Sequence, residues 1–69
     1  MLIVSINKSD KPLLSTAGVP VRINGEPQTI RKVGNTIQWC DSTGMIHTRH
    51  LLQTSEGDGL ITFIADSHD

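Results

Sequence analysis

The chain has 69 residues, and its six Lys and Arg face seven Asp and Glu, so the formal net charge at pH 7 is −1. A chain of this size buries only about 60% of the surface that its unfolded form exposes, and it has no room for a second lobe. The near-neutral charge provides no general attraction to nucleic acid or to anionic lipid. We therefore expect residues 1–69 to form one small domain with a thin core.

The single cysteine, Cys40, excludes an internal disulfide. The chain thus lacks the even-numbered cysteine framework of small secreted domains, which favours a reducing compartment. At the N-terminus the apolar run "MLIV" is followed at once by Ser5, Asn7 and Lys8. That run is far too short for a signal peptide or a membrane span. We predict a cytoplasmic location.

Taken in chain order, short runs rich in Val, Ile and Thr alternate with turn residues, and no long stretch places apolar residues at helical spacing. The predicted strands span residues 1–7, 19–23, 28–33, 36–40, 45–49 and 60–65, and residues 50–54 are a candidate for a single helical turn. Five to six short antiparallel strands at this spacing predict a small all-β barrel or meander. The first choice is an SH3-like barrel and the second is an OB-like one.

The first and last predicted strands, "LIVSI" and "LITFIA", are apolar on both faces. A domain of this size offers little second layer to cover the extra face. Large uncovered apolar patches usually mark contact sites, so these strands predict an oligomer or partner interface, with a homodimer as one form of it. The alternative is that both are central strands of a closed barrel.

Asn24-Gly25 is the strongest local signal, because both central positions of a type I′ turn need positive φ. A two-residue turn here pairs Val21 with Gln28. It places Val19, Val21, Ile23 and Ile30 on one face of the hairpin and Arg22, Thr29 and Arg31 on the other. Pro27 lacks a backbone donor, so we expect the returning strand to have a free edge near its start.

The stretch "TIQWCDSTGMIHTR" predicts a second hairpin. A four-residue loop over residues 41–44 turns Trp39 inward with Ile37 and Ile46. A three-residue loop is the alternative, and it would place Asp41, His47 and Arg49 beside Trp39 instead. We prefer the first register because it buries the apolar face. It leaves a candidate partner-binding surface of Gln38, Met45, His47 and Arg49.

The rare residues of this hairpin do not form a convincing metal or catalytic site. Zinc needs three or four convergent ligands, and Cys40, His47 and His50 are the only plausible local set. His47 and His50 are an odd number of positions apart, so on one strand they point to opposite faces. Cys40 and His47 share a face in the preferred register, but no oxyanion donor accompanies them, and a free cysteine is usually a buried or half-buried small hydrophobe. We expect no enzyme, no metal and no cofactor.

Nucleic-acid binding is the alternative function, through a modest basic strip. Arg22, Arg31, Lys32 and Arg49 would share an outer face if the two hairpins are adjacent. Only Trp39 and Phe63 are aromatic, which is few for a barrel that stacks bases. The fragments "MLIV", "VGNTIQW" and "IHTRHLLQ" resemble parts of the carbon storage regulator family, small all-β dimers that bind RNA. That family's arginine-rich stretch is replaced here by residues 7–12, so the resemblance implies only that Arg49 contacts a phosphate.

The sequence thus favours a binding module that acts through strand edges and exposed faces. Another protein is the first expected partner, because the terminal strands are apolar on both faces and the charge is near neutral. Such domains serve as regulators, inhibitors or accessory proteins, including those of phages and mobile elements. No membrane association is expected.

Overall fold

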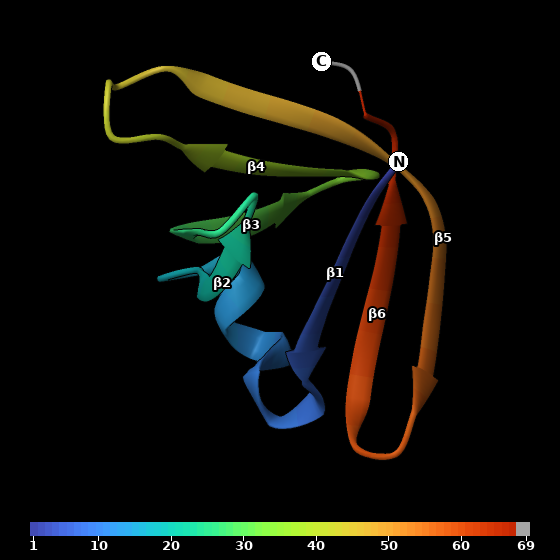
Figure 1. Cartoon of the computed structure of the whole chain (residues 1–69). Helices are drawn as coiled ribbons and strands as arrows, with labels where there is room; N and C mark the ends of the chain where they lie inside the picture. The colour runs from blue at the N-terminus through green and yellow to red at the C-terminus, as the bar shows by residue number, and fades with distance from the viewer. Residues whose placement is uncertain (68–69) are drawn as a thin grey trace.

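The computed structural model describes residues 1–67 and shows six antiparallel strands in a nearly closed barrel with one short 3-10 helix (Figure 1). The elements are β1 (Leu2–Asn7), helix η1 (Lys8–Ser15), β2 (Val19–Ile23), β3 (Glu26–Val33), β4 (Thr36–Cys40), β5 (Ile46–Gly57) and β6 (Leu60–Ala65). The predicted all-β barrel is confirmed, and it is consistent with both SH3-like and OB-like folds. No helix among the described residues has the length and apolar character needed to cross a membrane.

The sheet has the order β1-β6-β5-β4-β3-β2, and its curvature comes from two strands that change neighbours along their length. Residues 46–50 of β5 pair with β4, whereas residues 51–57 pair with β6, and an irregularity lies between Leu51 and Gln53. Bulges of this kind increase local twist and bend a strand. The helical turn considered for residues 50–54 is therefore wrong, because these residues continue β5 from one ladder into the next.

The strand β3 changes neighbours in the same way. Residues 26–30 pair with β2, and residues 31–33 pair with β4. The Asn24-Gly25 hairpin has the predicted register, with Val21 opposite Gln28 and with positive φ at both turn residues. The predicted free edge near Pro27 is also confirmed, since among the described residues only β2 forms a ladder with this part of β3.

The two terminal strands pair with each other, and β6 lies between β1 and β5. Their inward side chains belong to the core, while Ile3 points outward from β1 opposite Ile64 of β6. The other side of β1 packs near β2 without a ladder between them in the described part of the chain. Thus β6 is a central strand, as the closed-barrel alternative required, but β1 is an edge strand.

The core is a single apolar cluster inside the barrel. Its buried members are Val4, Ile6, Leu14, Val19, Ile23, Ile30, Ile37, Trp39, Leu51, Ile61, Phe63 and Ala65. Leu14 reaches this cluster from η1, which closes the lower end of the barrel in Figure 1. The backbone N–H of Lys8 donates to the carbonyl of Gly59 at 2.9 Å and so ties the start of η1 to the β5–β6 turn.

Candidate functional site

The β4–β5 hairpin has a different register from the one preferred on sequence. Trp39 lies opposite His47, and Cys40 lies opposite Ile46, as the three-residue alternative requires. Ile46 is consequently 69% exposed instead of packing with Ile37 and Trp39. The predicted four-residue loop is therefore wrong, because polar interactions within the loop set its length.

Asp41 holds that loop. Its Oδ1 accepts hydrogen bonds from the Thr43 N–H at 2.9 Å, the Thr43 hydroxyl at 2.6 Å and the Met45 N–H at 3.0 Å. Its Oδ2 lies 2.8 Å from Nε2 of His47. The Thr43 side chain, followed by His47, holds the pKa of Asp41 well below its usual range. The carboxylate is therefore ionised at neutral pH and keeps the turn closed.

Trp39 is a core residue whose indole is in contact with two polar side chains of β5. Its ring stacks on that of His47, with 5.1 Å between centroids and 13° between planes. The guanidinium carbon of Arg49 lies 5.1 Å from the indole centroid, within the range of a cation–π interaction. Trp39 is only 7% exposed, so the prediction that it turns inward is confirmed, although its partners on β5 are His47 and Arg49 instead of Ile46.

The ladder between β3 and β4 ends at the pair Arg31 and Gln38. Beyond this pair the two strands separate, and we call the gap between residues 27–30 of β3 and residues 39–42, at the end of β4 and the start of the loop that follows it, the fork. If the ladder continued, Thr29 and Cys40 would be the next pair to exchange backbone hydrogen bonds. The N–H of Asp41 donates toward β5, to the carbonyl of Met45 at 3.0 Å. Since backbone groups alternate sides along a strand, those of Cys40 face β3.

The same alternation applies to β3. The two-residue turn closes between Ile23 and Glu26, so Glu26 pairs its backbone groups with β2. Counting from there, the backbone groups of Thr29 face β4. The fork therefore presents backbone hydrogen-bonding groups from both strands, without a ladder partner in the part of the chain that the structure describes.

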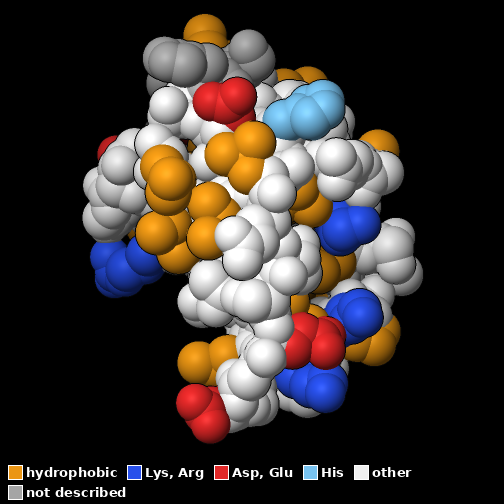
Figure 2. Space-filling view, turned by 90° about the vertical axis from the view of Figure 1, so that its right-hand side faces the viewer, with side chains coloured by type: hydrophobic (Ala, Val, Ile, Leu, Met, Phe, Trp, Pro, Cys, Tyr) orange, Lys and Arg blue, Asp and Glu red, His pale blue; other side chains and the backbone are white. Residues whose placement is uncertain are grey.

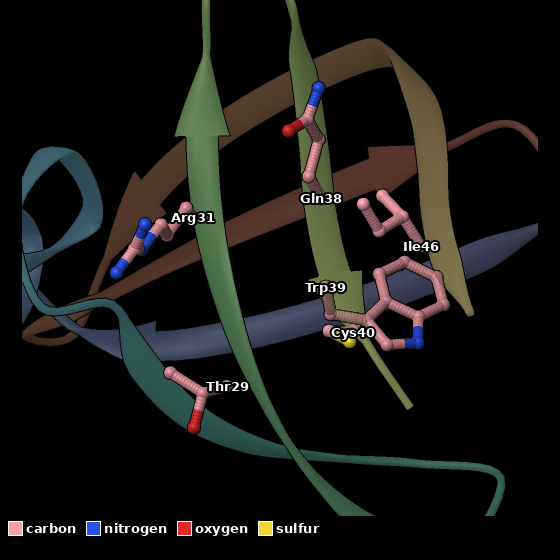
Figure 3. A pocket seen from close by; sticks show the side chains of 6 residues that line it. All are labelled: Thr29, Arg31, Gln38, Trp39, Cys40 and Ile46. Carbon is pink, nitrogen blue, oxygen red and sulfur yellow. The ribbon is translucent and has the colours of Figure 1, made fainter. Parts of the chain in front are cut away.

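A groove of about 390 Å³ lies on the outer face at this fork (Figure 3). It is lined by Thr29, Arg31, Gln38, Trp39, Cys40 and Ile46. In the view of Figure 3, the indole of Trp39 and the side chain of Ile46 lie toward one side, and Arg31 and Thr29 project from β3 toward the other. Trp39 points into the core yet lines the outer groove, because β3 has turned away and no longer covers it.

A second hollow of about 430 Å³ continues the groove toward the mouth of the fork. Its lining includes Thr29 and Cys40, which it shares with the first, together with Glu26, Pro27, Gln28, Asp41 and Ser42. The charges are thus separated along the groove. Arg31, the one cation among the lining residues of both hollows, lies at the closed end, and the carboxylates of Glu26 and Asp41 lie at the mouth. No carboxylate of the described residues is within ion-pair distance of Arg31.

The predicted partner-binding set is divided between two faces. Gln38 lines the outer groove, whereas His47 and Arg49 lie against Trp39 on the inner side of the hairpin. Met45 is 60% exposed at the loop. The structure therefore does not join these four residues into one surface.

The basic strip is divided as well. Arg22 and Arg31 point outward, and the Arg22 Nη1 donates to the carbonyl of Gly25 at 2.7 Å. Lys32 instead lines a cavity of about 350 Å³ beside η1, together with Lys11 and Phe63, and Arg49 lies on Trp39. The two hairpins are adjacent through β3 and β4, as the expectation required, but these four residues do not share one outer face.

The rare side chains of the hairpin are also separated. Cys40 is exposed, contrary to the expectation of a buried or half-buried thiol, and the register places it on the face opposite His47. Within residues 1–67, no three His, Cys, Asp or Glu side chains come together in a group suited to a metal ion. The imidazole of His47 contacts a turn carboxylate and an indole instead of a thiol.

An exposed apolar area lies on the outer face of β1, β6 and β5. Ile3 is 60% exposed opposite Ile64, and Gln53 of β5 pairs with Ile64 on its other side. Leu52 is also exposed at the irregularity of β5. Figure 2, which views the side where β5 lies in Figure 1, shows hydrophobic side chains gathered on this face.

Sequence reasoning missed the groove itself. Thr29 and Ile46 were assigned to no site, although Pro27 did indicate the free edge that borders the fork. No family model matches the chain, and neither a curated protein nor a solved structure matches it.

Proposed function

We propose that this domain is a non-enzymatic protein-binding module and that the groove between β3 and β4 is its binding site. The observation that carries the proposal is the fork, where two strands offer backbone groups beside an exposed Ile46 and the edge of Trp39. Unpaired strand edges are ready sites for another polypeptide, and pockets beside them add specificity. In this proposal the domain works in the cytoplasm, where the exposed thiol of Cys40 stays reduced.

The groove combines the groups that recognise protein better than nucleic acid. It has one cation and two carboxylates along its length, which gives no overall attraction to phosphate. Trp39 is 7% exposed and covered by His47 and Arg49, so it offers only an edge and no platform for a base. A regulator, inhibitor or accessory protein would use such a site to bind one target protein.

Affinity capture with matched variants tests the proposal. The domain is immobilised and exposed to lysate with and without nuclease, beside the variants Ile46→Glu and Leu52→Glu. Both side chains are exposed, at 69% and 60%, but only Ile46 lines the groove. We expect specific proteins to be retained after nuclease treatment, to be lost with Ile46→Glu and to be kept with Leu52→Glu.

Two outcomes would contradict the proposal. Capture that is equal for both variants would show that the groove is not used. Capture that disappears with nuclease, and that weakens steeply between about 50 and 200 mM salt, would favour nucleic acid instead.

The apolar face of β1, β6 and β5 supports a second proposal, a homodimer through the terminal strands. Ile3 and Ile64 lie side by side on this face without a covering layer in the described chain. Sedimentation should then show a dimer that Ile3→Lys dissociates. Met45→Lys is the matched control and should leave the dimer intact, because Met45 is also 60% exposed but lies at the β4–β5 loop and not on this face. A monomer up to high micromolar concentration would refute it.

A further inference from the structure

The groove is closed at one end and open at the other. The β3–β4 ladder closes it at Arg31 and Gln38, and the strands separate toward Pro27 and Ser42. A chain that passed through such a fork would have to bend sharply away from the barrel at the closed end. A chain that ends there would not.

The length of the fork fits a short extended segment. Four residue steps lead from Arg31 to Pro27 along β3, and a strand rises about 3.3 Å per residue. The fork therefore accommodates about five extended residues. Their backbone would meet the N–H and C=O groups of Cys40 on β4 and of Thr29 on β3.

Charge sets the direction of that segment. The exposed guanidinium of Arg31 stands at the closed end, where it can form a charge-assisted pair with a carboxylate. Glu26 stands at the mouth, where its carboxylate favours a basic side chain, and it lies in the same hollow as Asp41, whose own carboxylate is held by Thr43, Met45 and His47. A polypeptide that ends in a free carboxylate and carries a basic residue a few positions earlier has the complementary arrangement.

Resting on the protein-binding function above, we propose that the groove takes the free C-terminal end of a partner polypeptide, with its terminal carboxylate at Arg31. The segment runs antiparallel to β4, because β4 leads from Gln38 at the closed end to Cys40 toward the mouth. An apolar side chain among its last residues packs against Ile46 and the edge of Trp39.

A peptide library displayed with free C-termini tests the proposal. Selected sequences are synthesised as free acids and as C-terminal amides, and their affinities are measured by fluorescence anisotropy. We expect enrichment of a basic residue upstream of an apolar C-terminal residue. Amidation should weaken binding roughly 10- to 100-fold, the cost of losing a charge-assisted hydrogen bond.

Variants of the domain locate the carboxylate. Arg31→Ala should weaken the free acids as much as amidation does and leave the amides unchanged. Arg22→Ala is the matched control, since Arg22 is outward on β2 and lies outside the groove, and it should bind as the parent does. Bound peptide should also slow the reaction of Cys40, the single thiol, with a maleimide.

Three results would overturn the proposal: amides that bind as well as acids, selected peptides that leave Cys40 unprotected, or no enrichment of linear peptides. These failures are distinct from failure of the proposed function. If lysate capture depends on Ile46 while amides bind as well as acids, the groove binds protein but not a C-terminus. If capture does not depend on Ile46, the protein-binding function itself fails.

Discussion

The substitution Gly18→Ala tests how closely the chain packs against β3 beside the groove. Gly18 has a φ of +88°, and a Cβ there would lie 2.6 Å from Cγ2 of Thr29 and 2.9 Å from the carbonyl oxygen of Ile30. The Thr29 methyl can rotate away, but the Ile30 carbonyl belongs to the backbone of β3 and moves only with the strand.

Gly44→Ala isolates the backbone contribution to this cost. Gly44 has the same φ of +88°, and a Cβ there would meet no atom of the described residues within 4 Å. Placing alanine in this region costs about 1–2 kcal/mol. The overpacking at Gly18 adds about 1–3 kcal/mol, so Gly18→Ala should lower the free energy of unfolding by about 2–5 kcal/mol in total.

Urea unfolding measures both variants, with far-ultraviolet circular dichroism for the strands and the fluorescence of Trp39, the single tryptophan, for the core. A domain of this size is stabilised by only about 0.05–0.15 kcal/mol per residue, so Gly18→Ala approaches the limit of folding. If its free energy of unfolding lies within about 0.5 kcal/mol of that of Gly44→Ala, the close approach to Ile30 is not a real constraint.

Three further predictions concern the hairpin. Ile37 is fully buried, so Ile37→Ala should lower the free energy of unfolding by about 2–5 kcal/mol in the same urea assay, and a loss below 1 kcal/mol would contradict its place in the core. The pKa of Asp41 is lower in the folded chain than its unfolded value of about 3.9, so its ionised form stabilises the fold above that pH and this contribution falls as the pH drops. Asp41→Asn should therefore be less stable at pH 7 and lose less stability between pH 5 and 2, which acid titrations of both proteins would show. Cys40 is exposed and should react with a thiol reagent in native buffer before any unfolding, whereas a reaction that requires urea would place it inside the barrel.

Local turn chemistry explains which parts of the fold were predictable. Asn24-Gly25 specifies a two-residue turn because both positions need positive φ, and this alone sets the register of β2 against β3. Likewise, Pro27 indicates a free edge because it has no N–H to donate. Each of these inferences needs only the residues themselves and their immediate neighbours.

The loop of the second hairpin was harder, because its residues allow two lengths. A preference for burying Ile46 favoured the four-residue loop, but the Asp41 carboxylate gathers two backbone N–H groups, a hydroxyl and the imidazole of His47. That set of polar partners outweighs the burial of one isoleucine at the edge of a small barrel. One step of register then turned His47 and Arg49 onto Trp39 and left Ile46 in the groove.

The groove itself depends on contacts between distant parts of the chain. The all-β class, the strand positions in the first half of the chain and the inward Trp39 follow from alternation and turn residues. The fork exists because β3 pairs with β2 as far as Ile30 and with β4 only from Arg31 onward, a division that barrel closure imposes on a strand shared by two neighbours. The pattern of residues does not predict the position at which such a strand changes neighbours. Thr29, Cys40 and Ile46 therefore come together to line one groove only in the folded barrel.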